Sequence, residues 1–194
     1  MLTIAILLVI GGLVAYIIVT YNNLVSTKKQ IKASIQEIGN QLKRQANLIP
    51  NLTESVKGYL KHERGIFDKL TAARQQALEA AASGNLEAMG KASEAVRQAI
   101  SPIKVIFESN PELKSQEVVK SLMDNLRDTA DKVTYSRRLL IDLVADFNTK
   151  ISTFPGLLLA KLFGFKEEKG LKTPETGEHV EVDVKETKAP KVKL

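Results

Sequence analysis

The sequence predicts an all-α protein with an N-terminal transmembrane helix, an antiparallel up-and-down four-helix bundle and a disordered C-terminal tail. Three observations lead to this prediction. The chain starts with an uncharged apolar stretch, apolar residues then recur every three or four positions, and the last segment mixes both charges with few large apolar side chains. We expect the anchor and its interface at residues 1–27, the bundle at 28–165 and the tail at 166–194.

The composition excludes several kinds of site. The 194 residues include no cysteine and only two histidines, His62 and His179. Disulfides, thiolate metal sites and cysteine nucleophiles are therefore ruled out, and little material is left for an imidazole site. The sequence contains neither a glycine-rich phosphate loop nor a nucleophile elbow. We expect no enzymatic activity, no metal and no cofactor.

The start of the chain has the length and composition of a membrane span. No acidic or basic residue precedes Lys28, and the stretch 2–19 is almost entirely apolar. As a helix it would extend about 27 Å at about 1.5 Å per residue, close to the thickness of the hydrocarbon layer. A cleaved signal peptide is the alternative, but no basic region precedes the apolar run and no small-x-small site stands just before Tyr21. We therefore expect an uncleaved anchor.

Positive charge follows the apolar stretch instead of preceding it. Lys28, Lys29 and Lys32 come soon after it, while only the terminal amine stands before it. The positive-inside rule then places the N-terminus outside and the bulk of the chain in the cytoplasm. We also expect these three lysines to lie at anionic lipid headgroups. Gly11 and Ala15 form one pair of small residues, which lets two spans approach closely. The sequence is therefore compatible with a homo-oligomer.

The helical pattern begins as a continuation of the span. Between residues 21 and 49 apolar side chains recur at helical spacing, and Pro50 is expected to end or kink this helix at Ile49. A second stripe over residues 52–77 predicts a second helix. That helix should stop at the turn Ser83-Gly84-Asn85.

Two further helices complete the predicted bundle. The third should begin after Asn85, a good N-cap residue, and Pro102 should interrupt it near its end. Residues 108–111 form the next expected loop. The longest helix should open near Ser115 and stop at Phe154-Pro155-Gly156. Four amphipathic helices with short connections fold most simply as an antiparallel bundle.

One acidic residue interrupts the second apolar stripe. Glu63 is expected to pair with a basic residue inside the bundle, either Arg74 or Arg137, and so to specify which helices face each other. The neighbouring pair His62-Glu63 is not a zinc-protease motif. The fourth residue after His62 is Ile66, so the second histidine ligand is missing.

The apolar segment 157–165 follows the return of the fourth predicted helix toward the membrane. It either lies on the membrane interface as a short amphipathic helix or caps the open end of the bundle core, and the sequence leaves both open. Its candidate interface residues are Leu158, Leu162, Phe163 and Phe165.

The segment 166–194 holds seven lysines and seven acidic residues, so the net charge of +6 belongs to the rest of the chain. This balance and the few large apolar groups predict a solvated tail. Within the helices, cations alternate with acids instead of forming a basic face. We therefore expect no nucleic-acid partner.

Short sequence pieces follow one another along the chain in a characteristic order. They are Tyr21-Asn22-Asn23-Leu24-Val25, Gln41-Leu42-Lys43-Arg44, Leu48-Ile49-Pro50-Asn51-Leu52, Val56-Lys57-Gly58-Tyr59, His62-Glu63, Ala73-Arg74, Asn110-Pro111-Glu112-Leu113-Lys114, Ser136-Arg137-Arg138, Phe147-Asn148, Phe154-Pro155 and Gly164-Phe165. By their order and spacing they resemble the LemA family of bacterial membrane proteins. The likeness covers nearly everything from the span to Phe165.

The chain departs from the family pattern at a few places. Gln45 and Asn47 stand where the family usually has a second Arg and an Asp, which removes a potential ion pair. Leu139-Leu140 replaces the family's Tyr-Asn after the paired arginines. The resemblance implies a helical bundle anchored in the bacterial cytoplasmic membrane by a single span, and it supplies no catalytic residues.

We expect a non-enzymatic scaffold or adaptor whose partners are the lipid membrane and a protein of unknown identity. Tyr21, Asn22, Arg44, Asn51 and Asn148 are the candidates for partner contact, and the alternative is that they form hydrogen bonds between helices. A second hypothesis is a membrane-stress or membrane-shaping protein. It would act on lipid through the lysines after the span and the interface residues named above.

Overall fold

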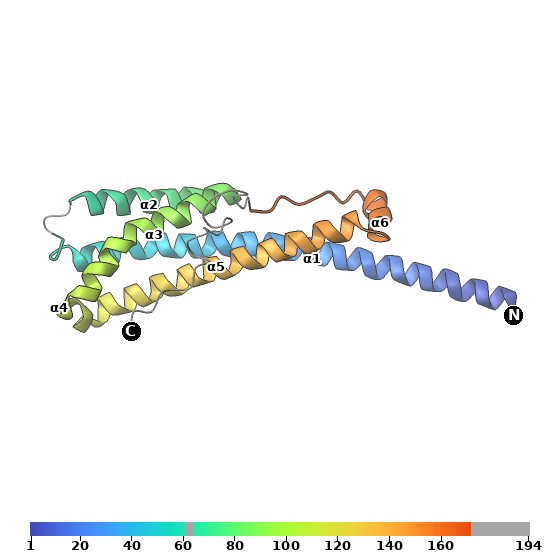
Figure 1. Cartoon of the computed structure of the whole chain (residues 1–194), viewed down its shortest axis with the longest axis horizontal. Coiled ribbons are helices and arrows are strands. Elements are labelled where there is room, and N and C mark those ends of the chain that lie inside the picture. The colour runs from blue at the N-terminus through green and yellow to red at the C-terminus, as the bar shows by residue number, and fades with distance from the viewer. Residues whose placement is uncertain (61–63, 172–194) are drawn as a thin grey trace, which may run out of the picture.

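The computed structural model describes residues 1–60 and 64–171, and every regular element in these ranges is an α-helix (Figure 1). The all-α class predicted from the sequence is confirmed. The helices are α1 (Leu2–Val56), α2 (Arg64–Ser83), α3 (Leu86–Ser109), α4 (Pro111–Ser115), α5 (Glu117–Ser152) and α6 (Gly156–Phe163).

Helix α1 joins the apolar start of the chain to the core without a break. Its first part, residues 2–19, projects beyond the other helices and is covered by other parts of the chain at almost no position (Figure 1). In the ranges that the structure describes, α1 is the one helix long and apolar enough to cross a membrane. From Leu24 to Val56, buried side chains recur at helical spacing, so the same helix then forms part of the core.

Pro50 lies inside α1, which continues to Val56, so a helix end at Ile49 would come about two turns too early. Proline lacks the N–H that would bond to the carbonyl four residues earlier. Leu52 and Val56 nevertheless extend the buried stripe and are fully buried. The hydroxyl of Thr53 donates to the carbonyl of Ile49 at 2.8 Å. Burial of the two apolar side chains therefore outweighs the lost backbone hydrogen bond.

Helices α2 and α3 differ from the prediction in where α2 begins and in the effect of Pro102. Because α1 takes up the start of the second predicted stripe, α2 begins only at Arg64. Asn85 caps α3 as predicted, since its side chain accepts hydrogen bonds from the backbone N–H of Glu87 and Ala88. Pro102 lies inside α3, which continues past it to Ser109, so the predicted interruption of the helix is wrong.

The short helix α4 is absent from the sequence prediction, which has a loop at residues 108–111 and the next helix opening near Ser115. Asn110 caps it by accepting a hydrogen bond from the N–H of Glu112 at 3.0 Å, and Pro111 occupies its first turn. Leu113 is fully buried and closes the end of the core between α3 and α5. The turn signal was therefore correct, but the turn contains a helix of its own.

The long helices are packed as successive neighbours. Helix α1 lies along α5 and α2, and α2 lies along α3. Figure 1 shows that α2 and α3 cover only the half of α1 and α5 that is far from the N-terminus. The buried side chains form two clusters. We call the cluster that contains Ile49, Leu70 and Ile103 the distal core. We call the cluster nearer the apolar segment, which contains Leu24 and Phe147 and also Ala80 of α2 and Met89 of α3, the proximal core. The largest fully buried residues are Ile49, Leu52, Leu70, Ile103 and Leu113 in the distal core and Leu24, Ile38, Leu42, Leu140 and Phe147 in the proximal core.

After α6 the chain turns back along the proximal core, and we call residues 164–171 the strap. Gly164 ends α6 with φ +72°, a conformation that favours glycine. Phe165 and Leu171 then pack against the proximal core. The prediction that the solvated tail begins at residue 166 therefore places its start too early, because residues 166–171 lie on the helices. Residues 172–194 are outside the described ranges, and a solvated tail there stays a prediction.

Candidate functional site

Pieces of the chain that are distant in sequence meet at the proximal end of the molecule. They are the end of the apolar part of α1, the last turns of α5, helix α6 and the strap (Figure 1). We call this region the junction. It is built on Tyr21, Asn23, Phe147, Asn148, Lys150, Phe163, Phe165 and Glu168.

Aromatic rings form the apolar side of the junction. The ring centroids of Tyr21 and Phe163 are 4.8 Å apart, and those of Tyr21 and Phe165 are 5.8 Å apart. Phe165 meets the fully buried Phe147 edge to face, with centroids 6.2 Å apart. These distances are typical of stabilising aromatic pairs. A single tyrosine at the end of the apolar segment therefore ties α1 to both α6 and the strap.

Polar contacts hold the strap at its middle. Asn148 Nδ2 donates to the carbonyl of Glu168 at 3.0 Å, and the N–H of Glu168 donates to Asn148 Oδ1 at 2.9 Å. The carboxylate of Glu168 also pairs with Lys28 Nζ at 2.7 Å. An asparagine side chain can satisfy a backbone donor and acceptor together. Asn148 thus fixes the strap to α5, and Lys28 fixes it to α1.

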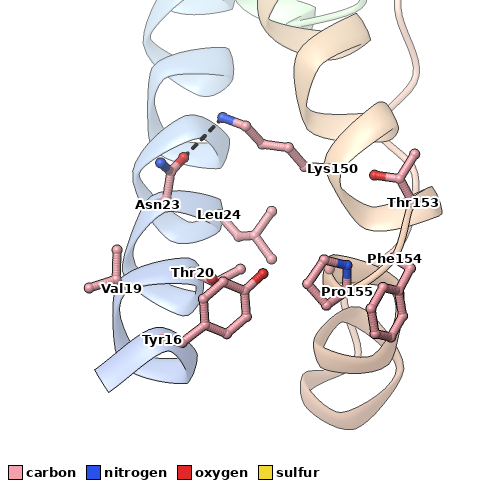
Figure 2. Close-up of a pocket in the computed structure, with 10 residues that line it drawn as sticks. Tyr16, Val19, Thr20, Asn23, Leu24, Lys150, Thr153, Phe154 and Pro155 are labelled. Atoms are coloured by element: carbon pink, nitrogen blue, oxygen red, sulfur yellow. Dashed lines mark hydrogen bonds between the residues drawn. The ribbon is translucent and has the colours of Figure 1, made fainter. Parts of the chain in front are cut away.

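A pocket of about 270 Å³ lies between α1 and the turn that connects α5 to α6 (Figure 2). Lys150 Nζ donates to Asn23 Oδ1 across its upper end at 3.1 Å and also pairs with Asp146 at 2.7 Å. Figure 2 shows the rings of Tyr16, Pro155 and Phe154 at the opposite end. The lining consists of Tyr16, Val19, Thr20, Asn23, Leu24, Lys150, Thr153, Phe154, Pro155 and Gly156.

Helix α6 has two different faces. Gly156, Leu159 and Ala160 are buried against the neighbouring helices, whereas Leu158 and Leu162 are 59% and 72% exposed. At Gly156 a Cβ atom would collide with the carbonyl oxygen of Lys150, so the close approach of α6 to the end of α5 requires glycine there. One face therefore caps the proximal core, and the opposite face is an uncovered apolar surface.

The sequence as a whole can be assigned to a family. The model of the LemA family matches residues 34–185. This chain belongs to the LemA family. No curated protein is similar enough to the chain to count as a relative. The family match begins inside α1 of this LemA protein, after the apolar segment, and it includes Phe147, Asn148 and the strap.

In this LemA protein the candidate residues divide into engaged and uncovered side chains. Tyr21 and Asn148 contact other elements at the junction, as described above. Asn22 and Asn51 are exposed, and neither side chain forms a hydrogen bond within the described ranges. Of the predicted headgroup lysines, Lys28 pairs with Glu168, whereas Lys29 and Lys32 are exposed on α1.

Of the three arginine candidates, Arg44 and Arg74 lie next to residues of the distal core, and Arg137 lies at the level of the proximal core. Arg44 donates from Nη2 to Asn125 Oδ1 at 3.0 Å and so links α1 to α5. Arg74 on α2 is half-buried, and its Nε has no hydrogen-bond partner among the described residues. Arg137 on α5 lies close to Gly90 on α3. The partner proposed for both, Glu63, is outside the described ranges, so that pairing stays a prediction.

Near Arg137 one carboxyl group is electrostatically perturbed. Hydrogen bonds from Arg97 and then Gln98 hold the pKa of the Glu94 carboxyl below its ordinary value, and the nearby charge of Arg137 acts in the same direction. Glu94, Arg97 and Gln98 lie on α3, a helix that contributes no residue to the junction. The contacts of Glu94 with Arg97 and Gln98 are three and four residues apart and stabilise α3.

Sequence reasoning missed three members of the junction. Asn23 and Lys150 are four residues or fewer from predicted candidates, but their contact joins positions 127 residues apart. Glu168 was placed in a tail whose charges balance. Its only local signal is that it follows Gly164-Phe165, the last piece of the family pattern. Among the described residues there is no group of His, Cys, Asp and Glu that could hold a metal ion.

Proposed function

We propose that the protein is a non-enzymatic scaffold anchored by a single span in the bacterial cytoplasmic membrane, with its N-terminus outside and its helical domain in the cytoplasm. The observation that carries this proposal is the continuity of α1. One helix of 55 residues contains both the uncovered apolar segment and a full stripe of the core. A domain joined in this way moves with its anchor.

The proposal gives the domain a defined height above the membrane. From Tyr21 to Val56 a helix rises about 50 Å at about 1.5 Å per residue. The four long helices would act as an antiparallel up-and-down bundle, and the chain direction visible in Figure 1 supports this arrangement. The distal core would then present its surface to a protein partner at a fixed distance from lipid. Nucleic acid is not among the partners we propose.

Helix α6 would provide a second contact with the membrane. Its exposed residues, Leu158 and Leu162, lie beside Phe163, which contacts Tyr21 at the end of the apolar segment. A short helix with one uncovered apolar face is suited to the lipid interface. Lys29 and Lys32 are exposed on the adjoining part of α1 and would meet anionic headgroups. Two contacts fix the tilt of the domain, which a span alone leaves free.

The orientation can be tested because the chain has no cysteine. Single-cysteine variants Thr3→Cys and Asn51→Cys of the full chain are labelled in spheroplasts with a maleimide that cannot cross membranes. We expect Thr3→Cys to react at once and Asn51→Cys to react only after permeabilisation. The reverse order would overturn the orientation, and loss of both variants to the soluble fraction would overturn the anchor.

The contact of α6 can be tested with the same chain in nanodiscs. A spin label at Leu162→Cys should be accessible to oxygen dissolved in lipid and protected from a water-soluble nickel complex. A label at Asn51→Cys, which is far along α1 from the junction, should show the opposite pattern. Nickel access at both positions would mean that α6 only caps the core.

The uncovered face of α6 also favours a second function, in which the protein shapes or clusters membranes. The two functions differ in what the distal surface contacts. A photocrosslinking side chain at Asn51 in native membranes should form one defined protein adduct if the protein is a scaffold. Clustering of liposomes by the pure full chain, together with the absence of such an adduct, would favour the membrane-shaping function.

A further inference from the structure

The pocket at the junction has one polar end and one apolar end, and it lies where the apolar segment of α1 ends. We propose that it binds a single phospholipid with an anionic headgroup. The phosphate would lie at Lys150 and Asn23, and an acyl chain would run along the apolar part of α1. This inference rests on the proposed membrane anchoring, and it names a ligand that the anchoring alone does not require.

The polar end of the pocket is suited to a phosphate. Lys150 carries the only charge among the lining residues. Two contacts of its ammonium group are accounted for, to Asn23 and Asp146, which leaves one N–H free. The carboxamide of Asn23 uses its oxygen for that contact, so its NH₂ group remains available. A charged donor beside a neutral donor is a common arrangement for phosphate oxygens.

The hydroxyl groups of the lining extend this polar end by one turn. Thr20 lies on α1 about one turn below Asn23, and Thr153 faces it from the end of α5 (Figure 2). The Thr153 hydroxyl donates to the carbonyl of Thr149 at 2.9 Å and can still accept a hydrogen bond. Glycerol and ester groups of a lipid would lie at this level.

The other end of the pocket is apolar and uncovered. Val19 is 66% exposed and Phe154 is 80% exposed, and both line the pocket. Tyr16 lies seven residues before Asn23, which is about 10 Å deeper along the helix. That distance separates a headgroup phosphate from the first methylene groups of the acyl chains. The volume of about 270 Å³ is too small for a whole lipid, so the chains would continue along α1.

The experiment uses the full chain in phosphatidylcholine nanodiscs that contain a minor fraction of a photoreactive lipid. The probe is either phosphatidylglycerol or phosphatidylcholine, each with a diazirine in the acyl chain. Adducts are mapped by peptide mass spectrometry. We expect phosphatidylglycerol to label Tyr16, Val19 and Phe154 well above the average of the apolar segment. Phosphatidylcholine should label the whole segment evenly.

Two variants and two controls test the assignment. Thr20→Trp, at a lining position whose side chain points into the pocket in Figure 2, should fill the pocket and abolish the enriched labelling, whereas Ile18→Trp, at an exposed position outside the lining, should not. Lys150→Gln should lower the enrichment for phosphatidylglycerol by about tenfold, as expected for one charged hydrogen bond. Lys161→Gln, an exposed lysine on α6 outside the lining, should leave it unchanged.

Each outcome decides one point. Even labelling by phosphatidylglycerol, or enrichment that Thr20→Trp leaves intact, would overturn the lipid site while the anchor stands. Displacement of the label by inorganic phosphate would mean that the site takes free phosphate and would also overturn the lipid assignment. Failure of the chain to remain with the nanodiscs would instead contradict the proposed anchoring.

Discussion

Asn148 on α5 holds the backbone of Glu168 by two hydrogen bonds, one to the carbonyl and one from the N–H group. These residues are 20 positions apart. The side chain of Asn148 satisfies both backbone hydrogen-bonding groups of Glu168, which lies outside any helix. The strap is thus attached to the helices by a side chain. This attachment holds Phe165 and Leu171 of the strap against the proximal core.

Replacing Asn148 by Ala should release the strap. Both backbone groups of Glu168 would lose their partner, at a cost of about 1 kcal/mol for each hydrogen bond. Amide hydrogen exchange at residues 165–171 should therefore accelerate by up to about thirtyfold, while exchange in α2 and α3 stays unchanged.

Asn148→Asp provides an internal comparison. Its carboxylate keeps the acceptor for the N–H of Glu168 but loses the donor for the carbonyl, so exchange should be intermediate. Asn51→Ala, at an exposed position on α1, should have no effect. Equal exchange in Asn148→Ala and the parent chain would mean that the aromatic contacts alone hold the strap.

The ring of Tyr21, and not its hydroxyl group, should stabilise the junction. The contacts of Tyr21 are with the rings of Phe163 and Phe165, so Tyr21→Phe should be neutral. Tyr21→Ala removes two aromatic pairs of about 1 kcal/mol each together with buried apolar area. It should lower the Tm of the full chain in detergent, measured by circular dichroism. Tyr135→Ala, at a ring that is 68% exposed, is the control. Loss of stability in Tyr21→Phe would instead assign the effect to the hydroxyl group.

Most of the fold follows from local pattern. The spacing of apolar residues indicates the helices, and the N-caps at Asn85 and Asn110 begin α3 and α4. What fails is the rule that proline ends a helix. Pro50 and Pro102 both lie inside helices because tertiary burial on either side of them exceeds the cost of one missing hydrogen bond. Such burial depends on partner helices, which local rules do not include.

The junction is less predictable than the helices for a related reason. Sequence identifies Tyr21, Phe147 and Asn148 as parts of recurring pieces but not what they contact. Glu168 lies in a segment with balanced charge and few large apolar residues, which predicts a solvated tail. Two anchoring contacts, from Lys28 and Asn148, overcome that preference. Contacts between residues so far apart in the sequence can be identified only when the packing of α1 against α5 is known.

Mild acid should weaken two surface contacts. The hydrogen bond from Lys132 and the charge of Arg44 hold the pKa of Asp128 below its ordinary value of 3.8, and hydrogen bonds from Arg97 and Gln98 lower the pKa of Glu94 below 4.5. A lowered folded-state pKa contributes stability above the unfolded-state value. That contribution is lost as the pH falls through the folded-state pKa. Stability should therefore decrease as the pH drops below about 4.5.

The assignment of this acid effect can be checked by substitution. Asp128→Asn should lower the Tm slightly at about pH 7, and the difference from the parent chain should shrink in acid, as the pH falls through the folded-state pKa of Asp128. Asp142→Asn, at an exposed position on α5, should show no difference at either pH. A difference for Asp128→Asn that stays the same as the pH is lowered would indicate a packing effect instead of a charge effect.

Gln45 places a polar group in the core between α3 and α5. Its side chain is 3% exposed, its Oε1 has no hydrogen-bond partner among the described residues, and its neighbours around a pocket include Val96 and Leu126. A buried acceptor without a partner costs free energy, and an apolar group of similar shape removes that cost. Gln45→Met should therefore raise the free energy of unfolding by about 1 kcal/mol and the Tm by about 3 °C. Gln76→Met on the exposed face of α2 should change neither. A fall in Tm for Gln45→Met would mean that the amide has a hydrogen-bonded water or ligand in this pocket, because only the loss of such a partner would make the polar side chain the more stable one.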